Sequence, residues 1–121
     1  MNILIADNNK ANRLAIKSYI HKLWSEAVVY EENNLDAVVK DVFDVSYELL
    51  IIDINIPGND QIEGFIKQAT KYTKVIILSD LDNEEAGKLA HLGIDAYLSK
   101  SASENEIMST LLFVLSNYLP S

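Results

Sequence analysis

Polar residues that can bind a phosphoryl group or a metal ion follow four short apolar runs of the sequence. They are Asp7 and Asn8, Asp53 and Asn55, Ser79 and Asp80, and Ser99 and Lys100. Converging carboxylates raise one another's pKa unless a cation compensates them, and Mg²⁺ takes hard oxygen ligands of this kind. A lysine and a hydroxyl suit the oxygens of a phosphoryl group. The set predicts phosphoryl binding or transfer onto a carboxylate, with Asp53 as the favoured nucleophile because it ends the most central and most apolar run.

These residues can act together only if the apolar runs end at one edge of a sheet. The runs cover residues 3–6, 28–30, 49–52 and 75–78, with a weaker fifth at 96–98. None of them alternates polar with apolar residues, which favours parallel strands buried on both faces. In a doubly wound parallel sheet, ligands bind outside the carboxyl ends of the strands.

The stretches between these runs carry apolar residues at helical spacing, such as Ile16, Ile20 and Leu23 after the first run. Ser103 and Glu106 form a capping-box pattern that predicts the start of a last helix. The order is therefore β-α repeated five times, which predicts an α/β fold: a five-stranded parallel sheet with helices on both faces.

Composition limits the class of protein. The chain has 121 residues, a formal charge of −8 and no cysteine. One domain over residues 1–121 fits this length, and no apolar stretch approaches the ~20 residues that span a bilayer. The negative charge argues against direct binding to nucleic acid or to anionic lipid. We expect a cytoplasmic acidic domain with no membrane association.

The sequence resembles the receiver domain of two-component response regulators over essentially its whole length. The resemblance rests on ILIAD at 3–7, LIIDINIPG at 50–58, VIILS at 75–79 and GIDAYLSK at 93–100. It implies a flavodoxin-like (βα)5 fold and a sensor histidine kinase that donates a phosphoryl group, with Mg²⁺, to Asp53. It also implies Mg²⁺ ligands at Asp7, Asn8, Asp53 and Asn55, phosphoryl contacts from Ser79 and Lys100, and a rotamer change of Tyr97 on activation.

Three positions depart from the family pattern. Asn8 stands where the family usually has a metal-binding aspartate, so this position contributes no charge to Mg²⁺ binding. Asp80 follows the hydroxyl where the family favours a small residue, and it could repel a phosphoryl group or restore metal charge. Gln61 replaces a customary glycine, so the loop after Pro57 is expected to differ if that glycine uses a positive φ.

The end of the chain suggests a connection to a further domain. The segment 117–121 resembles the junction at which receivers of LuxR-type helix-turn-helix regulators pass into their linker, and Pro120 cannot continue a helix. The expectation is a transcription regulator that binds DNA only through an output domain absent from this chain. A stand-alone receiver is the alternative.

The switch is expected to act through the face formed by the fourth helix, the fifth strand and the fifth helix, where a homodimer could form. This face carries Glu84, Glu85, Lys88, His91, Asp95 and Ser99. We expect no enzymatic activity beyond slow removal of the domain's own phosphoryl group.

Two other classes of function remain open. A pseudo-receiver would bind proteins without phosphorylation, and Asn8 and Asp80 favour it. An enzyme or cofactor carrier on the same architecture is disfavoured, because Asp7-Asn8-Asn9-Lys10 is neither a flavin phosphate loop nor a Gly-x-Gly-x-x-Gly motif.

Overall fold

The structure, a computed structural model, describes residues 1–80 and 84–121, without the side chains of 84–86. The strands are β1 (Asn2–Ala6), β2 (Val28–Glu32), β3 (Leu49–Asp53), β4 (Lys74–Ser79) and β5 (Ala96–Ser99). The α-helices are α1 (Lys10–Leu23), α2 (Leu35–Asp44), α3 (Ile62–Ala69), α4 (Glu84–Leu89) and α5 (Glu104–Val114). Short 3₁₀ turns, η1 (Asn59–Gln61) and η2 (Ala90–Leu92), precede α3 and follow α4. Within the described residues, no helix is both long and apolar enough to cross a membrane.

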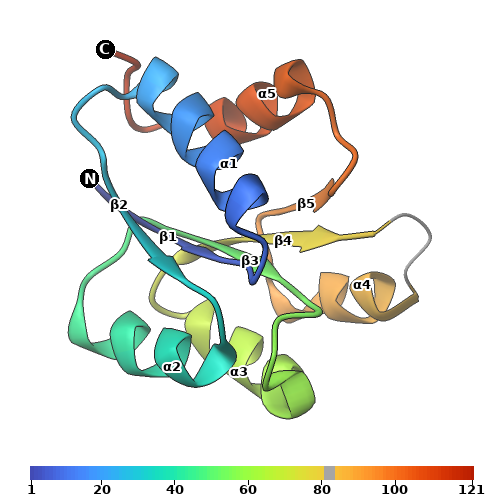
Figure 1. Cartoon of the computed structure of the whole chain (residues 1–121). Helices are drawn as coiled ribbons and strands as arrows, with labels where there is room; N and C mark the ends of the chain where they lie inside the picture. Colours follow the sequence, from blue (N-terminus) through green and yellow to red (C-terminus); the bar gives the residue numbers. More distant parts are fainter. Residues whose placement is uncertain (81–83) are drawn as a thin grey trace.

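The five strands form one parallel sheet in the order β2-β1-β3-β4-β5. Helices α1 and α5 cover one face, and α2, α3 and α4 cover the other (Figure 1). Each face has its own apolar core, centred on residues such as Ile5 and Ile20 on the first side and Ile52 and Ile66 on the second. The predicted doubly wound α/β fold is confirmed, and β3 is the central strand.

The predicted burial on both faces is correct for β1, β3 and β4 and wrong for the two edge strands, β2 and β5, the latter with Tyr97 43% exposed. Strands β1, β3 and β4 are almost wholly buried, whereas Val28 in β2 is 48% exposed. Strand β2 lies at the edge of the sheet, where one side has no neighbouring strand. A continuous apolar run therefore does not require a central position.

The helix ends follow the polar residues that precede them. Ser103 Oγ accepts a hydrogen bond from the N–H of Glu106 at 3.2 Å, so the predicted cap of α5 is present. Helix α5 ends at Val114, before the segment 117–121 that was expected to lead out of it. The tail then folds back onto the end of α1, where the N–H of Ser121 donates to the carbonyl of Leu23 at 2.8 Å.

The loop after β3 contains a left-handed residue at Gly58, with φ +83°. Gln61, the position at which the family has a glycine, has φ −109°, a value that any residue adopts. The loop thus places its positive φ three residues before the position that the resemblance suggested. It leads through η1 into α3 beside the carboxyl end of β3.

Candidate functional site

Four of the predicted residues reach the carboxyl edge of the sheet. Asp7 follows β1, Asp53 ends β3, Ser79 ends β4 and Lys100 follows β5. The two carboxylates and the hydroxyl are the polar side chains buried within the described part of the chain, each at most 1% exposed. Buried acids are costly unless paired, so this edge is unusual for a purely structural surface.

Lys100 connects the two acids. Its Nζ lies 2.5 Å from Asp53 Oδ2 and 3.8 Å from Asp7 Oδ2. Burial alone would lower the pKa of Lys100, but the hydrogen bond to Asp53 and the charges of Asp53, Asp7 and Asp80 raise it above its ordinary value. The ammonium therefore stays charged at neutral pH and offsets part of the negative charge of the acids.

Each buried carboxylate is held by a second donor from its own loop. Asp53 Oδ1 accepts the N–H of Asn55 at 2.9 Å. Asp7 Oδ1 accepts the N–H of Asn9 at 2.8 Å, and its Oδ2 accepts from Asn12 Nδ2 at 3.3 Å. One oxygen of each acid is thus fixed by the backbone, while the other faces Lys100. The pair is preorganised before any ligand binds.

These acids fit a magnesium ion. Mg²⁺ keeps several waters and is usually held by one or two carboxylates together with phosphate oxygens. Asp7 and Asp53 supply two buried carboxylates at one lysine, whereas Asn8 and Asn55 are exposed neighbours. No group of three or more acidic or histidine residues suited to a metal occurs in the described residues. The donor set is therefore suitable but carries two negative charges instead of three.

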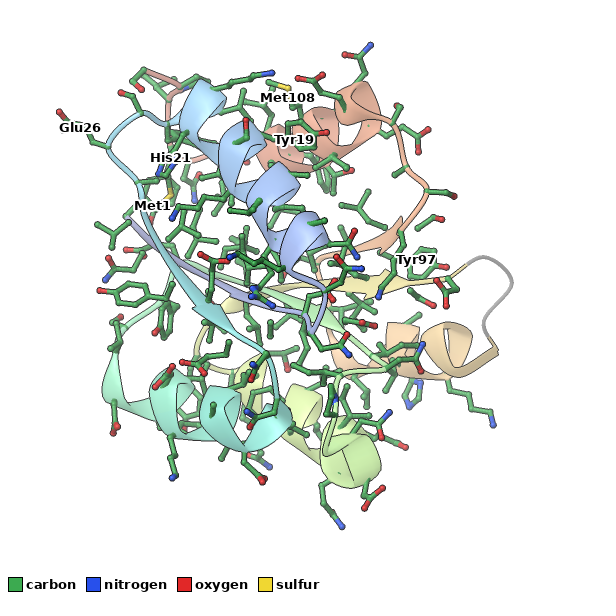
Figure 2. All side chains as sticks on the ribbon, in the orientation of Figure 1. Met1, Tyr19, His21, Glu26, Tyr97 and Met108 are labelled. Carbon is green, nitrogen blue, oxygen red and sulfur yellow. The ribbon has the colours of Figure 1, made fainter. Side chains whose placement is uncertain are left out.

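The two predicted switch residues converge on one backbone atom. Ser79 Oγ and Tyr97 Oη both donate to the carbonyl oxygen of Asp80, at 3.0 and 3.3 Å. Ser79 is buried and Tyr97 is 43% exposed beside the ends of β4 and β5 (Figure 2). In this structure the serine hydroxyl is therefore engaged by its own loop and not by Asp53.

Sequence reasoning missed Arg13, which ties the first two strands together at this edge. Its Nη1 donates to the carbonyl of Asp7 at 2.6 Å, and its Nε lies 3.0 Å from Glu31 Oε1 at the end of β2. The sequence could have indicated a role for Arg13, because this residue places a positive charge in the first turn of α1, where the helix dipole disfavours it. Such a residue needs a specific partner.

The structure describes only part of the expected output face, which α4, β5 and α5 form. Lys88 and His91 are exposed, whereas the side chains of Glu84 and Glu85 lie outside the described residues. Asp95 accepts the N–H of Val75 at 2.8 Å and lies 3.7 Å from Lys74, at the opposite edge of the sheet from Asp53. Asp95 is therefore a structural cap of β4, and its carboxylate is already engaged within the chain.

The fold and the site define a doubly wound α/β domain with a buried acid pair and a lysine at the carboxyl edge of its central strands. A family model described as "Response regulator receiver domain" matches residues 3–112. The chain belongs to this family, and it is homologous to two-component response regulators. Receiver domains generally bind Mg²⁺ at their phosphorylation site and interact with sensor kinases.

Individual relatives agree with this assignment. The Fimbriae Z protein of Salmonella typhimurium is 25% identical over 96% of the chain, and the transcriptional regulatory protein ResD of Bacillus subtilis is 28% identical over 88%. The chain spans 57% and 44% of these two proteins, about half their length. A CheY-like receiver domain from Methanospirillum hungatei superposes with a TM-score of 0.82 over 96% of this chain and 94% of its own, at 18% identity, which supports the fold.

Proposed function

We propose that this domain is a phosphorylation-controlled switch in which Asp53 accepts a phosphoryl group from a sensor histidine kinase. The observation that carries the proposal is the 2.5 Å contact between Lys100 Nζ and the buried Asp53 carboxylate, at the end of the central strand. A nucleophilic carboxylate needs a fixed position and an adjacent cation for the oxygens of the incoming group. Both are features of this site.

In the proposed transfer, an oxygen of Asp53 attacks the phosphorus of a phosphohistidine. A P–O bond forms while the P–N bond breaks, and its electron pair leaves on the imidazole nitrogen, which takes up a proton. The N–H of Asn55 holds the other oxygen of Asp53 in place. Lys100 then exchanges its contact with the carboxylate for one with the phosphoryl oxygens.

The acid edge supplies the ligands for a magnesium ion. We assign Asp7, Asp53, the amide of Asn8 and Asn55 to this role, and Mg²⁺ when bound there would add positive charge beside the phosphoryl oxygens. Asp7 is oriented for it by the N–H of Asn9 and by the Arg13 contact with its carbonyl. The neutral Asn8 weakens the affinity.

The switch runs through the carbonyl of Asp80. A phosphoryl group on Asp53 offers Ser79 a charged acceptor, which is stronger than a neutral carbonyl. When Ser79 Oγ leaves that carbonyl, Asp80 loses one of its two contacts, and Tyr97 exchanges the other for an inward position. The surface of α4, β5 and α5 then changes, which allows a homodimer to form there.

The output we propose is transcription. The relative ResD is named a transcriptional regulatory protein, and both relatives described above are about twice as long as the matched segment. We propose that DNA is bound by an output domain of the LuxR helix-turn-helix type, connected through residues 117–121. The receiver itself acts on no external substrate and at most removes its own phosphoryl group slowly.

The proposal is tested by incubation with Mg²⁺ and acetyl phosphate, followed by intact mass. Wild type should gain one phosphate, and Asp53→Asn should gain none. Asp60→Asn, at an exposed acid in η1 of the same loop, is the matched control and should label like wild type. Labelling of Asp53→Asn to the level of the control would refute the assignment of Asp53.

A pseudo-receiver is the second candidate, and the exposed Asn8 beside only two buried site carboxylates favours it. It predicts no labelling in wild type at any Mg²⁺ concentration. It also predicts that beryllofluoride, a phosphoryl mimic, neither induces dimers nor perturbs the NMR signals around Tyr97.

A further inference from the structure

A small cavity lies behind the site lysine, between α1, the carboxyl ends of β4 and β5 and the start of α5. Its volume is about 120 Å³, and Ile16, Leu78 and Ile107 form apolar walls. Tyr19 borders it from the α1 side, where its side chain points toward α5 (Figure 2). The cavity is distinct from the surface on which Asp53 meets a phosphoryl donor, but Lys100 belongs to both.

The cavity exists because two of its lining positions carry the smallest apolar side chain. They are Ala15 on α1 and Ala102 in the turn before α5. Neither adds more than a methyl group to the walls. An apolar cavity of roughly 150 Å³ is known to hold benzene, so this one, at about 120 Å³, has room for a smaller ligand of roughly five non-hydrogen atoms.

Its polar lining connects it to the acid pair. Asn12 donates to Asp7 Oδ2 at 3.3 Å, and Lys100 lies 2.5 Å from Asp53 Oδ2. Both residues also line the cavity. An occupant would therefore touch the two side chains that hold the two buried carboxylates.

Charge selects the class of ligand. The charged residue among the described residues that line the cavity is Lys100, and its ammonium is already paired with Asp53 and Asp7. A ligand of either charge would therefore leave water for largely apolar walls without an unengaged partner, which is costly. An uncharged molecule with an apolar body and one hydroxyl avoids this cost.

We propose that this cavity binds a small, neutral, hydroxyl-bearing molecule and that its occupancy displaces Lys100 from Asp53. Binding itself is independent of the proposed function. Its consequence, a change in the rate at which Asp53 is phosphorylated, rests on that function. The two parts are therefore measured separately.

Binding is tested with tert-butanol, a neutral alcohol with about five non-hydrogen atoms, by following the methyl NMR signals of Ile16 and Ile107 in the full chain. We expect saturable shifts with a dissociation constant on the order of 1 mM. Ala15→Leu fills the cavity and should weaken binding at least about tenfold. Ala11→Leu, one turn earlier on α1 at an exposed residue that does not line the cavity, should leave binding unchanged. Ala102→Val provides a second filled variant if Ala15→Leu does not fold.

Equal binding by wild type and a folded filled variant, or shifts at Ile16 and Ile107 no larger than those of exposed methyl groups, would overturn the site. For the coupling, saturating tert-butanol should change the initial rate of acetyl phosphate labelling at least about twofold in wild type and Ala11→Leu, but not in Ala15→Leu. An unchanged rate with binding intact overturns the coupling. Absence of any labelling without tert-butanol counts against the proposed function and leaves the binding result valid.

Discussion

The two ends of the parallel strands use the same residue types for different purposes. We call the end at which the strands begin the amino edge and the end at which they finish the carboxyl edge. At the amino edge, Glu48 and Asp95 are partly exposed and accept the N–H groups of Asn2 and Val75, at 2.7 and 2.8 Å. These carboxylates complete the hydrogen bonding of strand ends. At the carboxyl edge, Asp7 and Asp53 are buried and share one ammonium.

The difference shows what separates a structural acid from a chemical one. A partly exposed carboxylate that accepts a backbone N–H contributes to stability and keeps its water. Two desolvated carboxylates around a single lysine remain under-compensated, and a further cation or a phosphoryl transfer relieves that imbalance. Burial and the count of nearby charges, more than residue type, mark the functional edge.

The largest expected effect follows from removing the lysine at each edge. Lys100→Met leaves two buried carboxylates without a cation and should reduce the free energy of unfolding by about 3 kcal/mol. Lys74→Met breaks only the exposed 3.7 Å contact with Asp95 and should cost less than about 0.5 kcal/mol. Urea denaturation of both variants at pH 7 without Mg²⁺ measures the two values. Equal losses would remove the proposed distinction between the edges.

The next effect concerns the charge that the carboxyl edge lacks. Asn8→Asp adds a third acid at an exposed position, and hard cations respond strongly to ligand charge. We expect Mg²⁺ to bind roughly tenfold more tightly, as measured by calorimetry. Quenching of Trp24 fluorescence is not suitable for measuring Mg²⁺ binding, because Trp24 is buried at the far end of α1 from Asp7. Asp80→Asn is the companion variant, and a loss of affinity there with no gain in Asn8→Asp would show that Asp80 serves the ion.

The sequence predicts the positions of the strands and helices better than it predicts their burial and their tertiary contacts. The run at 49–52 predicted β3 to within one residue, because a central strand is apolar on both faces. The exposure of β2 could not be predicted in the same way, since its edge position depends on the strand order of the whole sheet. The contact of the tail with α1, between the N–H of Ser121 and the carbonyl of Leu23, joins residues far apart in the chain and could not be predicted from local sequence.

The candidate site was likewise predictable only in part. The convergence of Asp7, Asp53 and Lys100 follows from strand ends alone, since parallel strands finish at one edge. The directions of side chains and N–H groups inside the loops do not follow. Ser79 donates to Asp80, and Asn55 reaches Asp53 through its backbone, which depends on loop conformation. The roles given to these residues in phosphorylation remain predictions.

A single buried polar atom at the amino edge offers a sharper test of the comparison. The hydroxyl of Tyr47, in the loop before β3, is buried and makes no hydrogen bond to the described residues. Burial, followed by the charges of Asp41, of the ionised Tyr30 hydroxyl and of Glu32, raises its pKa to about 12. Because an unpaired buried hydroxyl is destabilising, Tyr47→Phe should increase the free energy of unfolding by about 1 kcal/mol. Acetyl phosphate labelling should not change.

Tyr30→Phe is the matched control for this variant. Tyr30 packs edge-to-face against Tyr47, with ring centroids 5.3 Å apart, but is 37% exposed. Its hydroxyl reaches water, so its removal should change stability by less than about 0.5 kcal/mol. A loss of stability in Tyr47→Phe would mean that its hydroxyl has a partner, and the amino edge would then hold a polar site of its own.

The smallest expected effect is a pH dependence at the carboxyl edge, where Glu32 and Asp41 form an acid pair without a lysine. Burial, together with the hydrogen bond and charge of Asp41, raises the pKa of Glu32 above its ordinary value near 4.5. The folded protein therefore binds this proton more tightly than the unfolded chain, so the stabilisation is complete below pH 4.5 and is lost as pH rises through the raised pKa.

Glu32→Gln should be a few tenths of a kcal/mol more stable than wild type at pH 7. The difference should vanish below pH 4.5, whereas Glu26→Gln, at an exposed acid, should show none at either pH. Urea denaturation at both pH values measures it, and a variant less stable than wild type at pH 7 would show that Glu32, like Asp53, has a compensating cation.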